Sequence, residues 1–315
     1  MPDARSLPAA LGAPAFLSAG WLSRWFGGPP PATPLRATVE LALPGDGAPE
    51  ARLQVGWSTD PGCVREINED AIRVVRPVSA TDLATHGVLA VVCDGMGGHE
   101  AGEIASGLAI EAFVRGAAAH ERDAAAQLVR CVEAANLAVF EAAQRDRKLA
   151  GMGTTCTGLL LRGGAAYCAH VGDSRCYLVR DGEIFLMTED HSAVMELVRQ
   201  GVITRDEARH HPDKNVISRA LGSQRRVAVS AWPQPLGLRP GDRFLICSDG
   251  LYDLVEDVEL RDTMLGLDAQ GACDALVRLA RERGGFDNIS VAVLALPAND
   301  SARPVRETRA IEVAT

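Results

Sequence analysis

Short apolar runs separated by glycine, proline and acidic residues make up most of the chain beyond residue 50. Runs of this length that are rich in valine, leucine and isoleucine are typical of β-strands. They predict strands over residues 53–59, 71–75, 88–93, 154–161, 165–171, 176–179, 184–187, 227–232, 244–247 and 289–296. The Asp181-Gly182 pair between two of these runs predicts a hairpin turn.

Helices are predicted where apolar residues recur at three- and four-residue spacing. The positions expected to face inward are Ile104, Leu108 and Ala112 in a first helix, Leu128, Val132, Ala135 and Val139 in a second, and Leu276 and Leu279 in a later one. The strands come in runs and the helices in pairs, rather than in strict alternation. This order predicts an α+β fold in which helices cover two antiparallel sheets.

Three segments depart from this pattern. Residues 1–50 are rich in proline, alanine and glycine and predict a flexible leader. An amphipathic helix from Pro14 to Gly27 that carries Trp21 and Trp25 remains an alternative for part of it. Residues 51–297 are expected to form one domain with a polar, partly helical flap at about 190–222, and residues 298–315 a loose tail.

Composition narrows the function classes. The net charge of -9 argues against a nucleic-acid binder, which needs clustered positive charge to hold phosphates. Only Lys148 and Lys214 are lysines, and the many arginines are scattered among acidic residues, which is typical of a solvated surface. We therefore expect no nucleic-acid partner.

The eight cysteines occur singly, without a C-x-x-C pair, and this pattern predicts a reducing compartment such as the cytoplasm. Four of them lie in strand-like runs, namely Cys93, Cys156, Cys168 and Cys247. The sequence contains no run of about 18 apolar residues, so no membrane span is predicted. A secretory signal in the leader is disfavoured because Asp3 weakens a basic start and prolines interrupt the apolar stretch.

Five acidic motifs stand where predicted strands end or begin. They are Arg65-Glu66-Ile67-Asn68-Glu69-Asp70, Asp94-Gly95-Met96-Gly97-Gly98-His99, Gly172-Asp173-Ser174-Arg175, Ser248-Asp249-Gly250 and Asp287-Asn288. Any one Asp-Gly pair is most simply a turn. Five together predict a cage of oxygen ligands, which suits Mg²⁺ or Mn²⁺, whereas zinc would need histidine or cysteine clusters.

From about Leu53 to Leu296 the chain resembles the bacterial form of the metal-dependent type 2C serine/threonine protein phosphatases, the PPM family. The acidic motifs carry the resemblance, together with Gly153-Thr154-Thr155, Glu189-Asp190-His191-Ser192 and Leu221-Gly222. The resemblance implies a four-layer α-β-β-α sandwich, in which helix pairs flank two antiparallel sheets and a dinuclear metal centre lies at one end.

The resemblance also implies roles for individual residues. Asp94 would bridge two Mn²⁺ or Mg²⁺ ions, and Arg65 would bind the substrate phosphate, which its planar guanidinium can grip through two oxygens. The remaining ligands implied are the Gly95 carbonyl, Glu69, Asp70, Asp249 and Asp287, with Asp173 on a third, weaker ion.

The expected reaction is direct hydrolysis of phosphoserine or phosphothreonine by a hydroxide held between two cations. Cys93 and Cys247 lie beside the predicted ligands, but neither begins the Cys-x5-Arg loop that a cysteine phosphatase needs. Met96 stands where many eukaryotic relatives have a histidine proposed as the general acid. The acid is therefore left open between His99, His191 and a metal-bound water.

Phosphorylated proteins are the expected substrates, a bacterial serine/threonine kinase is the expected counterpart by resemblance, and a monomer is expected. Two alternatives remain. One is a phosphatase specialised for anti-sigma-factor antagonists, which the Arg65 motif and the long flap disfavour. The other is a catalytically weak relative that serves as a binding module, which the complete set of ligand positions disfavours.

Overall fold

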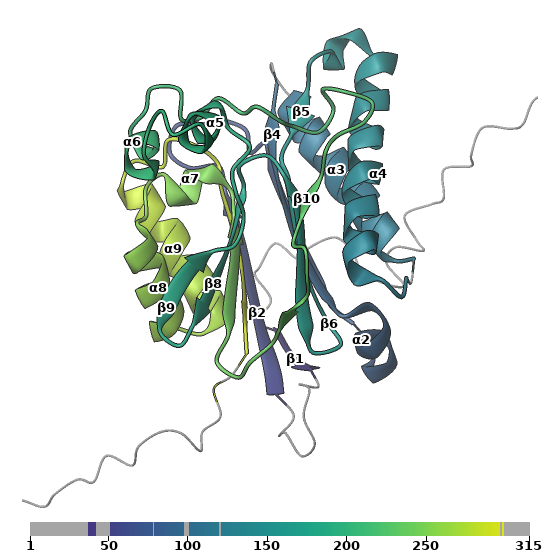
Figure 1. Ribbon diagram of the computed structural model, residues 1–315, viewed down its shortest axis with the longest axis vertical. Coiled ribbons are helices and arrows are strands. Elements are labelled where there is room, and N and C mark those ends of the chain that lie inside the picture. Colours follow the sequence, from purple (N-terminus) through teal and green to yellow (C-terminus); the bar gives the residue numbers. More distant parts are fainter. Residues whose placement is uncertain are drawn as a thin grey trace, which may run out of the picture.

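Two antiparallel sheets, stacked face to face, form the centre of the computed structural model (Figure 1). The structure describes residues 37–41, 51–77, 79–97, 101–119, 121–296 and 298. The first sheet has the order β1 (Ala37–Leu41), β2 (Ala51–Asp60), β13 (Ile289–Ala295), β12 (Arg243–Cys247), β8 (Arg175–Arg180), β9 (Glu183–Leu186). The second has the order β10 (Ser230–Ala231), β7 (Ala165–Val171), β6 (Cys156–Arg162), β4 (Val88–Met96), β3 (Asp70–Val75), with β11 (Leu236–Gly237) paired to β7 and β5 (Gly153–Thr154) to β4.

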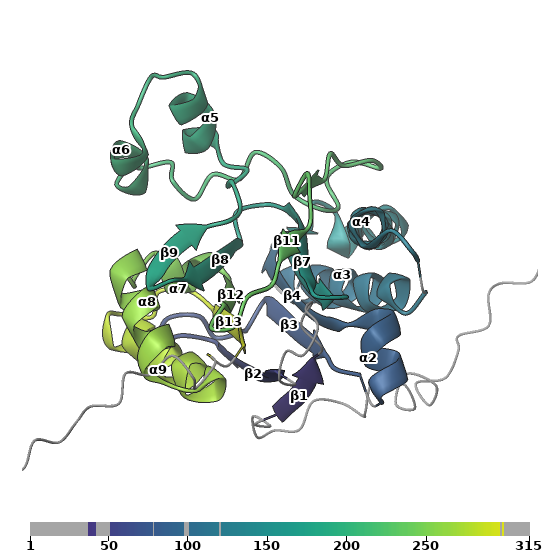
Figure 2. The same ribbon diagram turned by 60° about the horizontal axis from the view of Figure 1, so that its bottom comes forward.

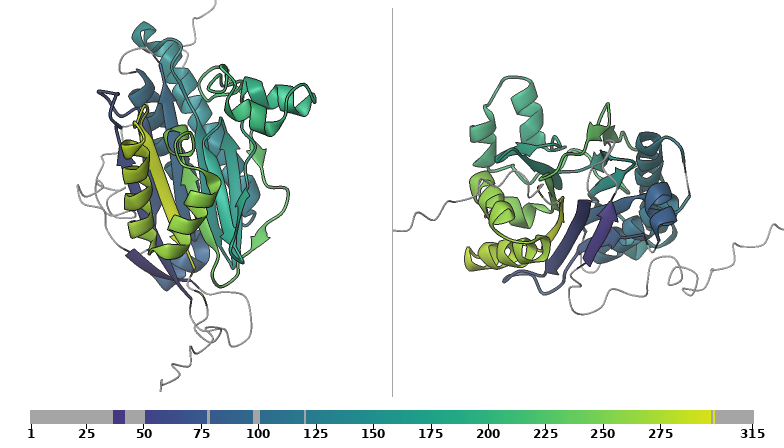
Figure 3. Two further views of the ribbon diagram at one scale, coloured as in Figure 1. Left: turned by 90° about the vertical axis from the view of Figure 1, so that its left-hand side faces the viewer. Right: turned by 90° about the horizontal axis from the view of Figure 1, so that it is seen from below.

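Helices cover the outer face of each sheet, which completes four layers (Figures 1 and 3). The helices α3 (Ala101–Ala117) and α4 (Ala124–Arg145) pack on the second sheet, and α8 (Asp257–Gly266) and α9 (Ala269–Glu282) pack on the first. The shorter elements are α2 (Ala80–His86), the 3-10 turn η1 (Arg147–Leu149) and α7 (Asp249–Tyr252). The predicted α+β sandwich is confirmed.

Three apolar cores separate the four layers. The central core lies between the sheets and includes Leu159 and Ile246, both fully buried. One outer core joins the second sheet to α3 and α4 through Phe113 and Val139. Gly158 on β6 lets α3 approach this sheet, because a Cβ at residue 158 would overlap the Phe113 ring. The third core joins the first sheet to α8 and α9.

The inward face predicted for the first helix is wrong by one step around the helix. Ile104 is 38% exposed, whereas Ala105, Ala109 and Phe113 are fully buried. The buried side of α3 combines alanines with Ile110, Phe113 and Val114, whereas the predicted Leu108 and Ala112 are only partly buried against the same core. The faces predicted for α4 and α9 are confirmed, with Leu128 and Leu276 both buried.

Residues 37–41 form β1, a strand that lies inside the predicted leader and pairs with β2. The rest of the leader, including the alternative helix from Pro14 to Gly27, lies outside the described residues, as does the tail apart from residue 298. The strand predicted over residues 227–232 is reduced to Ser230–Ala231. None of the helices in the described ranges is long and apolar enough to cross a membrane.

The predicted flap contains α5 (Ala193–Arg199) and α6 (Arg205–Arg209) and stands out from the sandwich (Figure 2). Three ion pairs connect it to α7 and α8. Arg209 Nη1 lies 2.7 Å from Glu256 Oε2, Arg209 Nη2 lies 3.1 Å from Asp257 Oδ1, and Lys214 Nζ lies 2.6 Å from Asp253 Oδ2. Val194, Met195 and Ala208 of the flap are buried, so apolar packing contributes to its attachment alongside these ion pairs.

Candidate metal centre

The strand register brings the predicted acidic ligands to one end of the sandwich. Asp70 begins β3 and lies directly opposite Asp94 on β4. Asp249 follows the end of β12, Asp287 precedes β13, and Asp173 precedes β8. Because β8, β12 and β13 are neighbours in one sheet while β3 and β4 are neighbours in the other, residues far apart in sequence meet between the sheets.

These carboxyl groups raise one another's pKa values. Burial is the largest cause at each, and the charges of the neighbouring aspartates add to it. The pKa of Asp70 is raised to about 7 and that of Asp249 to about 6, and the pKa values of Asp94 and Asp173 are raised well above their ordinary value. Concentrated negative charge of this kind is stabilised by a cation.

Several carboxylate oxygens in this cluster are buried without a hydrogen-bond partner. They are Glu69 Oε1, Asp70 Oδ1, Asp173 Oδ1 and Asp249 Oδ1. Buried polar atoms without partners are rare in proteins, and carboxylate oxygens are the ligands that hard divalent cations take. The donor set therefore fits Mg²⁺ or Mn²⁺. As the side chains stand, no three His, Cys, Asp or Glu residues within the described ranges are placed to enclose an ion, so binding one requires side-chain movement.

Arg65 lies at the open edge of the cluster, where its guanidinium is shared between two acids. Its Nη2 is 2.8 Å from Asp287 Oδ2, and its Nη1 is 3.9 Å from Glu69 Oε2. Half of the Arg65 side chain remains exposed. The arginine is therefore held beside the centre by ion pairs and still faces the solvent from which a phosphate would approach.

Threonine and serine hydroxyl groups hydrogen-bond to the aspartates of the centre. Thr155 Oγ1 accepts from Asp94 N at 2.8 Å and lies 2.7 Å from Ser174 Oγ, which joins the Asp94 strand to the Asp173 turn. Ser248 Oγ donates to Asp70 Oδ2 at 2.7 Å and links the two sheets. Sequence reasoning assigned no role to these hydroxyls, although each stands inside or beside a motif it had singled out.

Asn288 ties the two loops at the edge of the centre together. Its Oδ1 accepts from Glu69 N at 2.7 Å, and its Nδ2 donates to the carbonyl oxygens of Pro61 and Ile67 at 3.1 and 3.0 Å. The sequence shows Asn288 as part of the Asp287-Asn288 motif but does not indicate that it joins these loops. Its amide places Glu69 and the loop that carries Arg65 next to Asp287.

Gly95 is required by close packing rather than by an unusual backbone angle. A Cβ at residue 95 would overlap the carbonyl oxygens of Gly102 and Glu69, and Gly95 N already donates to Glu69 O at 3.1 Å. Gly102 is restricted in the same way, because a Cβ there would meet the Glu69 carboxylate. Two glycines thus let α3 approach the strand end where Glu69 and Asp94 lie.

His191 is buried and hydrogen-bonded to Gly172, the residue that precedes Asp173. Its Nδ1 accepts from Gly172 N at 3.0 Å, and its Nε2 lies 2.9 Å from both Ser230 Oγ and Arg219 Nη1. Burial, and then the stacked ring of His170 and the charge of Arg219, lower its pKa to about 3. A neutral, fully bonded imidazole is a poor general acid. The other histidine considered, His99, lies outside the described residues.

The thiols near the site are unsuited to catalysis. Burial raises the pKa values of Cys93 and Cys247, which keeps both protonated. Cys156 and Arg162 have the Cys-x5-Arg spacing, but they are the two ends of strand β6 rather than of a phosphate-binding loop. Arg162 Nη1 donates to Gln127 Oε1 at 2.9 Å. All eight cysteines are unpaired.

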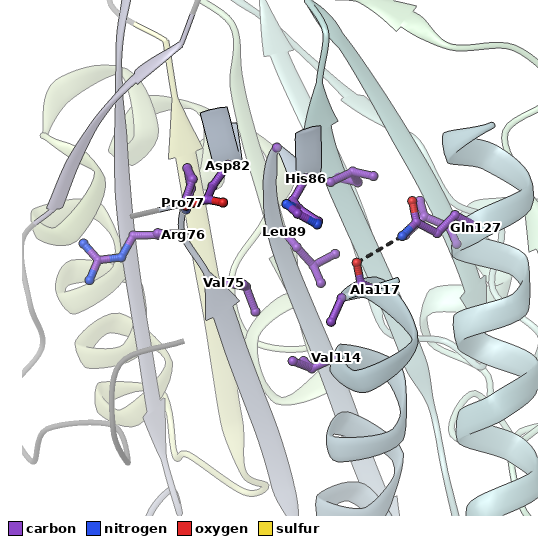
Figure 4. Close-up of a pocket in the computed structure, with 13 residues that line it drawn as sticks. Val75, Arg76, Pro77, Asp82, His86, Leu89, Val114, Ala117 and Gln127 are labelled. Carbon is purple, nitrogen blue, oxygen red and sulfur yellow. Dashed lines mark hydrogen bonds between the residues drawn. The ribbon is translucent and has the colours of Figure 1, made fainter. Parts of the chain in front are cut away.

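Two cavities differ in their relation to the centre. A cleft of about 470 Å³ separates the flap from α7 and α8 and is lined by Arg175, Tyr252 and Lys214 among others. A small cavity of about 40 Å³ lies at the opposite end of β4, where Figure 4 shows His86, Asp82 and Gln127 around it. None of the predicted metal ligands lines the small cavity, and it has room for only a few waters.

Known proteins share this arrangement. The family model of protein phosphatase 2C matches residues 65–281. The serine/threonine protein phosphatase PstP of Mycobacterium tuberculosis is 37% identical over 247 residues, which cover 76% of this chain and 44% of that protein. The serine/threonine phosphatase stp of Listeria welshimeri is 33% identical over 245 residues, which cover 76% of this chain and 94% of that protein. The chain thus spans less than half the length of PstP.

Solved structures agree in fold. The crystal structure of Mycobacterium tuberculosis PstP has a TM-score of 0.69 at 36% identity and covers 78% of this chain and 99% of that one. A crystal structure of the PstP catalytic domain in complex with two manganese ions has a TM-score of 0.66 at 35% identity and covers 78% and 98%. With its family-model match, its relatives and its four-layer sandwich, this chain belongs to the protein phosphatase 2C family.

Proposed function

We propose that this protein removes phosphate from phosphoserine and phosphothreonine in other proteins, using two divalent cations held by Asp70, Asp94, Asp249 and Asp287. The observation that carries the proposal is the set of buried, unpartnered carboxylate oxygens between the sheets. Such a cluster is unfavourable in isolation and becomes favourable with cations. Glu69 and the Gly95 carbonyl are proposed to complete the set, and Asp173 to hold a third, weaker ion.

When bound, two divalent cations would supply an acidified water for attack on phosphorus and would offset charge on the phosphate. The chain's own contribution is position and shape. Thr155 fixes the backbone of Asp94 and Ser248 holds one carboxylate oxygen of Asp70, so both residues are positioned before an ion binds. Arg65 faces solvent beside them and can orient two phosphate oxygens through its planar guanidinium.

Turnover of a phosphothreonine peptide tests the proposal. We expect the purified full chain to release phosphate when Mn²⁺ or Mg²⁺ is present and to stop when a chelator is added. The same assay separates the proposal from a binding module, since a module would bind the phosphopeptide without releasing phosphate. Comparison of the two metals at equal concentration decides which one the protein uses better.

Arg65→Ala should raise KM for the phosphopeptide about tenfold or more, because a charge-assisted contact to the phosphate contributes on the order of 1.5–3 kcal/mol. Arg65→Lys should recover only part of the loss, since lysine cannot grip two oxygens in one plane. Steady-state kinetics of both variants provide the measurement. A KM for Arg65→Ala equal to that of the wild type would remove Arg65 from the phosphate site.

We propose a bacterial serine/threonine kinase as the enzyme whose action this phosphatase reverses, and a monomer in the cytoplasm as its working form. The eight unpaired cysteines support a reducing compartment. Preference for phosphoserine on an anti-sigma-factor antagonist remains the narrower alternative. Assay of a general phosphothreonine peptide against such a phosphoprotein would separate the two.

A further inference from the structure

The two loops at the edge of the metal centre expose large apolar side chains. Val64 is 63% exposed, Phe286 62% and Ile67 39%. In the described part of the chain, only Val202 on the flap is as exposed as Val64 and Phe286. We call Val64, Ile67 and Phe286 the apolar rim. Apolar side chains gathered beside a functional site are typical of a surface that meets another molecule.

The rim residues are fixed beside Arg65 by contacts between the two loops. Cys63 N donates to Gly285 O at 2.7 Å, which places Val64 and Phe286 on adjoining segments. Arg65 is paired with Asp287 at 2.8 Å, one residue beyond Phe286. Because Asn288 binds the Ile67 carbonyl, all three rim residues belong to loops that are joined at several points.

The ring of Phe286 is also positioned by the chain itself. Gly284 has a φ of +122°, and a Cβ at residue 284 would overlap the Phe286 ring. Only glycine combines this backbone angle with an aromatic ring resting on it. The ring is thus supported on one side by Gly284 while most of its surface faces solvent.

We propose that the apolar rim receives an apolar side chain that lies next to the phosphorylated residue of the substrate protein. This inference rests on the proposed function, because it takes Arg65 as the group that binds the phosphate. A phosphoresidue held at Arg65 brings the residues on either side of it, whose Cα atoms are about 3.8 Å away along the chain, close to the adjoining loops.

Two phosphothreonine peptides that differ only in having leucine or serine at the positions flanking phosphothreonine test the proposal. With Mn²⁺ present, the wild type should have a kcat/KM about tenfold higher for the leucine peptide, since burial of one large apolar side chain is worth at least that factor. Phe286→Ser should bring the ratio of the two values close to one, and Val64→Ser should lower it by a smaller factor.

Phe185→Ser and Val258→Ser are matched controls. Phe185 on β9 is 48% exposed and Val258 on α8 is 54% exposed, and neither lies on a loop of the centre. Both should keep the wild-type ratio. An equal kcat/KM on the two peptides in the wild type, or a retained ratio in Phe286→Ser, would overturn the rim while leaving the phosphatase function standing.

Two further outcomes count against the proposal. If Phe286→Ser changes the mass measured by light scattering and not the peptide ratio, the rim joins two copies of the chain rather than binding substrate. If neither peptide nor a small aryl phosphate is hydrolysed with Mn²⁺, the proposed function fails and the rim fails with it. Hydrolysis of the serine peptide therefore distinguishes the two failures: if this peptide is hydrolysed, the phosphatase function stands even when the rim proposal fails.

Discussion

Asp94→Asn is expected to lower kcat on a phosphothreonine peptide by about a thousandfold, which corresponds to about 4 kcal/mol of transition-state stabilisation. Asp94 faces the other acids of the centre, and its neutral amide would bind a cation far more weakly than a carboxylate does. Asn is nearly the same size as Asp. The backbone contacts of residue 94 with Thr154 and Thr155 can therefore persist in the variant.

Measurements of activity and of folding must be made together for this variant. Circular dichroism should show a folded protein, and calorimetric titration with Mn²⁺ should show weakened binding. Asp181→Asn is a suitable control, because Asp181 has a φ of +55° in an exposed hairpin turn, where asparagine is well tolerated. Its activity should equal that of the wild type. Full activity in Asp94→Asn would refute the proposed centre.

The acidic cluster could be predicted from sequence because its members stand at the beginnings or ends of predicted strands. Asp94 and Asp249 follow apolar strands and precede glycine, and Asp287 precedes a strand. The ends of neighbouring strands lie together at one end of a sheet. Acidic residues at strand ends can therefore be expected to lie near one another even when the order of the strands is unknown. The register that sets Asp70 opposite Asp94 could not be read in this way, since it depends on pairing between segments.

The supporting residues were harder to predict because their partners are distant in sequence. Asn288 binds the Pro61 and Ile67 carbonyls more than 200 residues away, and Ser248 binds Asp70 at a separation of 178 residues. Serine and asparagine beside an aspartate are also ordinary turn and cap residues. Only the folded arrangement distinguishes a residue that holds the centre together from one that merely ends a strand.

Helix faces show where spacing rules fail. The α4 face was predicted correctly because its large residues all point to one side, as Leu128 and Val139 do. On α3 the buried side mixes small residues such as Ala105 with large ones such as Phe113, and the prediction was displaced from it because it started at the exposed Ile104. Close approach of a helix favours small residues at the contact, whereas apolar periodicity gives most weight to large ones. The strand β1 was missed for a different reason, since it lies within a proline- and alanine-rich leader.

Asp70→Asn should change thermal stability in opposite directions with and without metal. The folded-state pKa of Asp70, about 7, is above its ordinary value, because burial favours the neutral carboxyl. The stability linked to this group is therefore fully present below about pH 4 and is lost as the pH rises toward and through 7. Asparagine stays neutral, so in chelator the variant should exceed the wild type in Tm by less at pH 5 than at pH 8.

At pH 8 in chelator, the variant should melt about 5 °C or more above the wild type, since each pKa unit corresponds to about 1.4 kcal/mol and each kcal/mol moves Tm by about 2–4 °C in a domain of this size. The comparison at each pH removes the contribution of buried histidines, which both proteins share. Saturating Mn²⁺ should reverse the order, because a ligand that binds only the folded state stabilises the protein with the stronger site. Scanning calorimetry at pH 5 and 8 provides the measurement. A Tm difference that is independent of pH and of Mn²⁺ would show that Asp70 is an ordinary buried hydrogen-bond acceptor for Ser248 rather than part of a cation site.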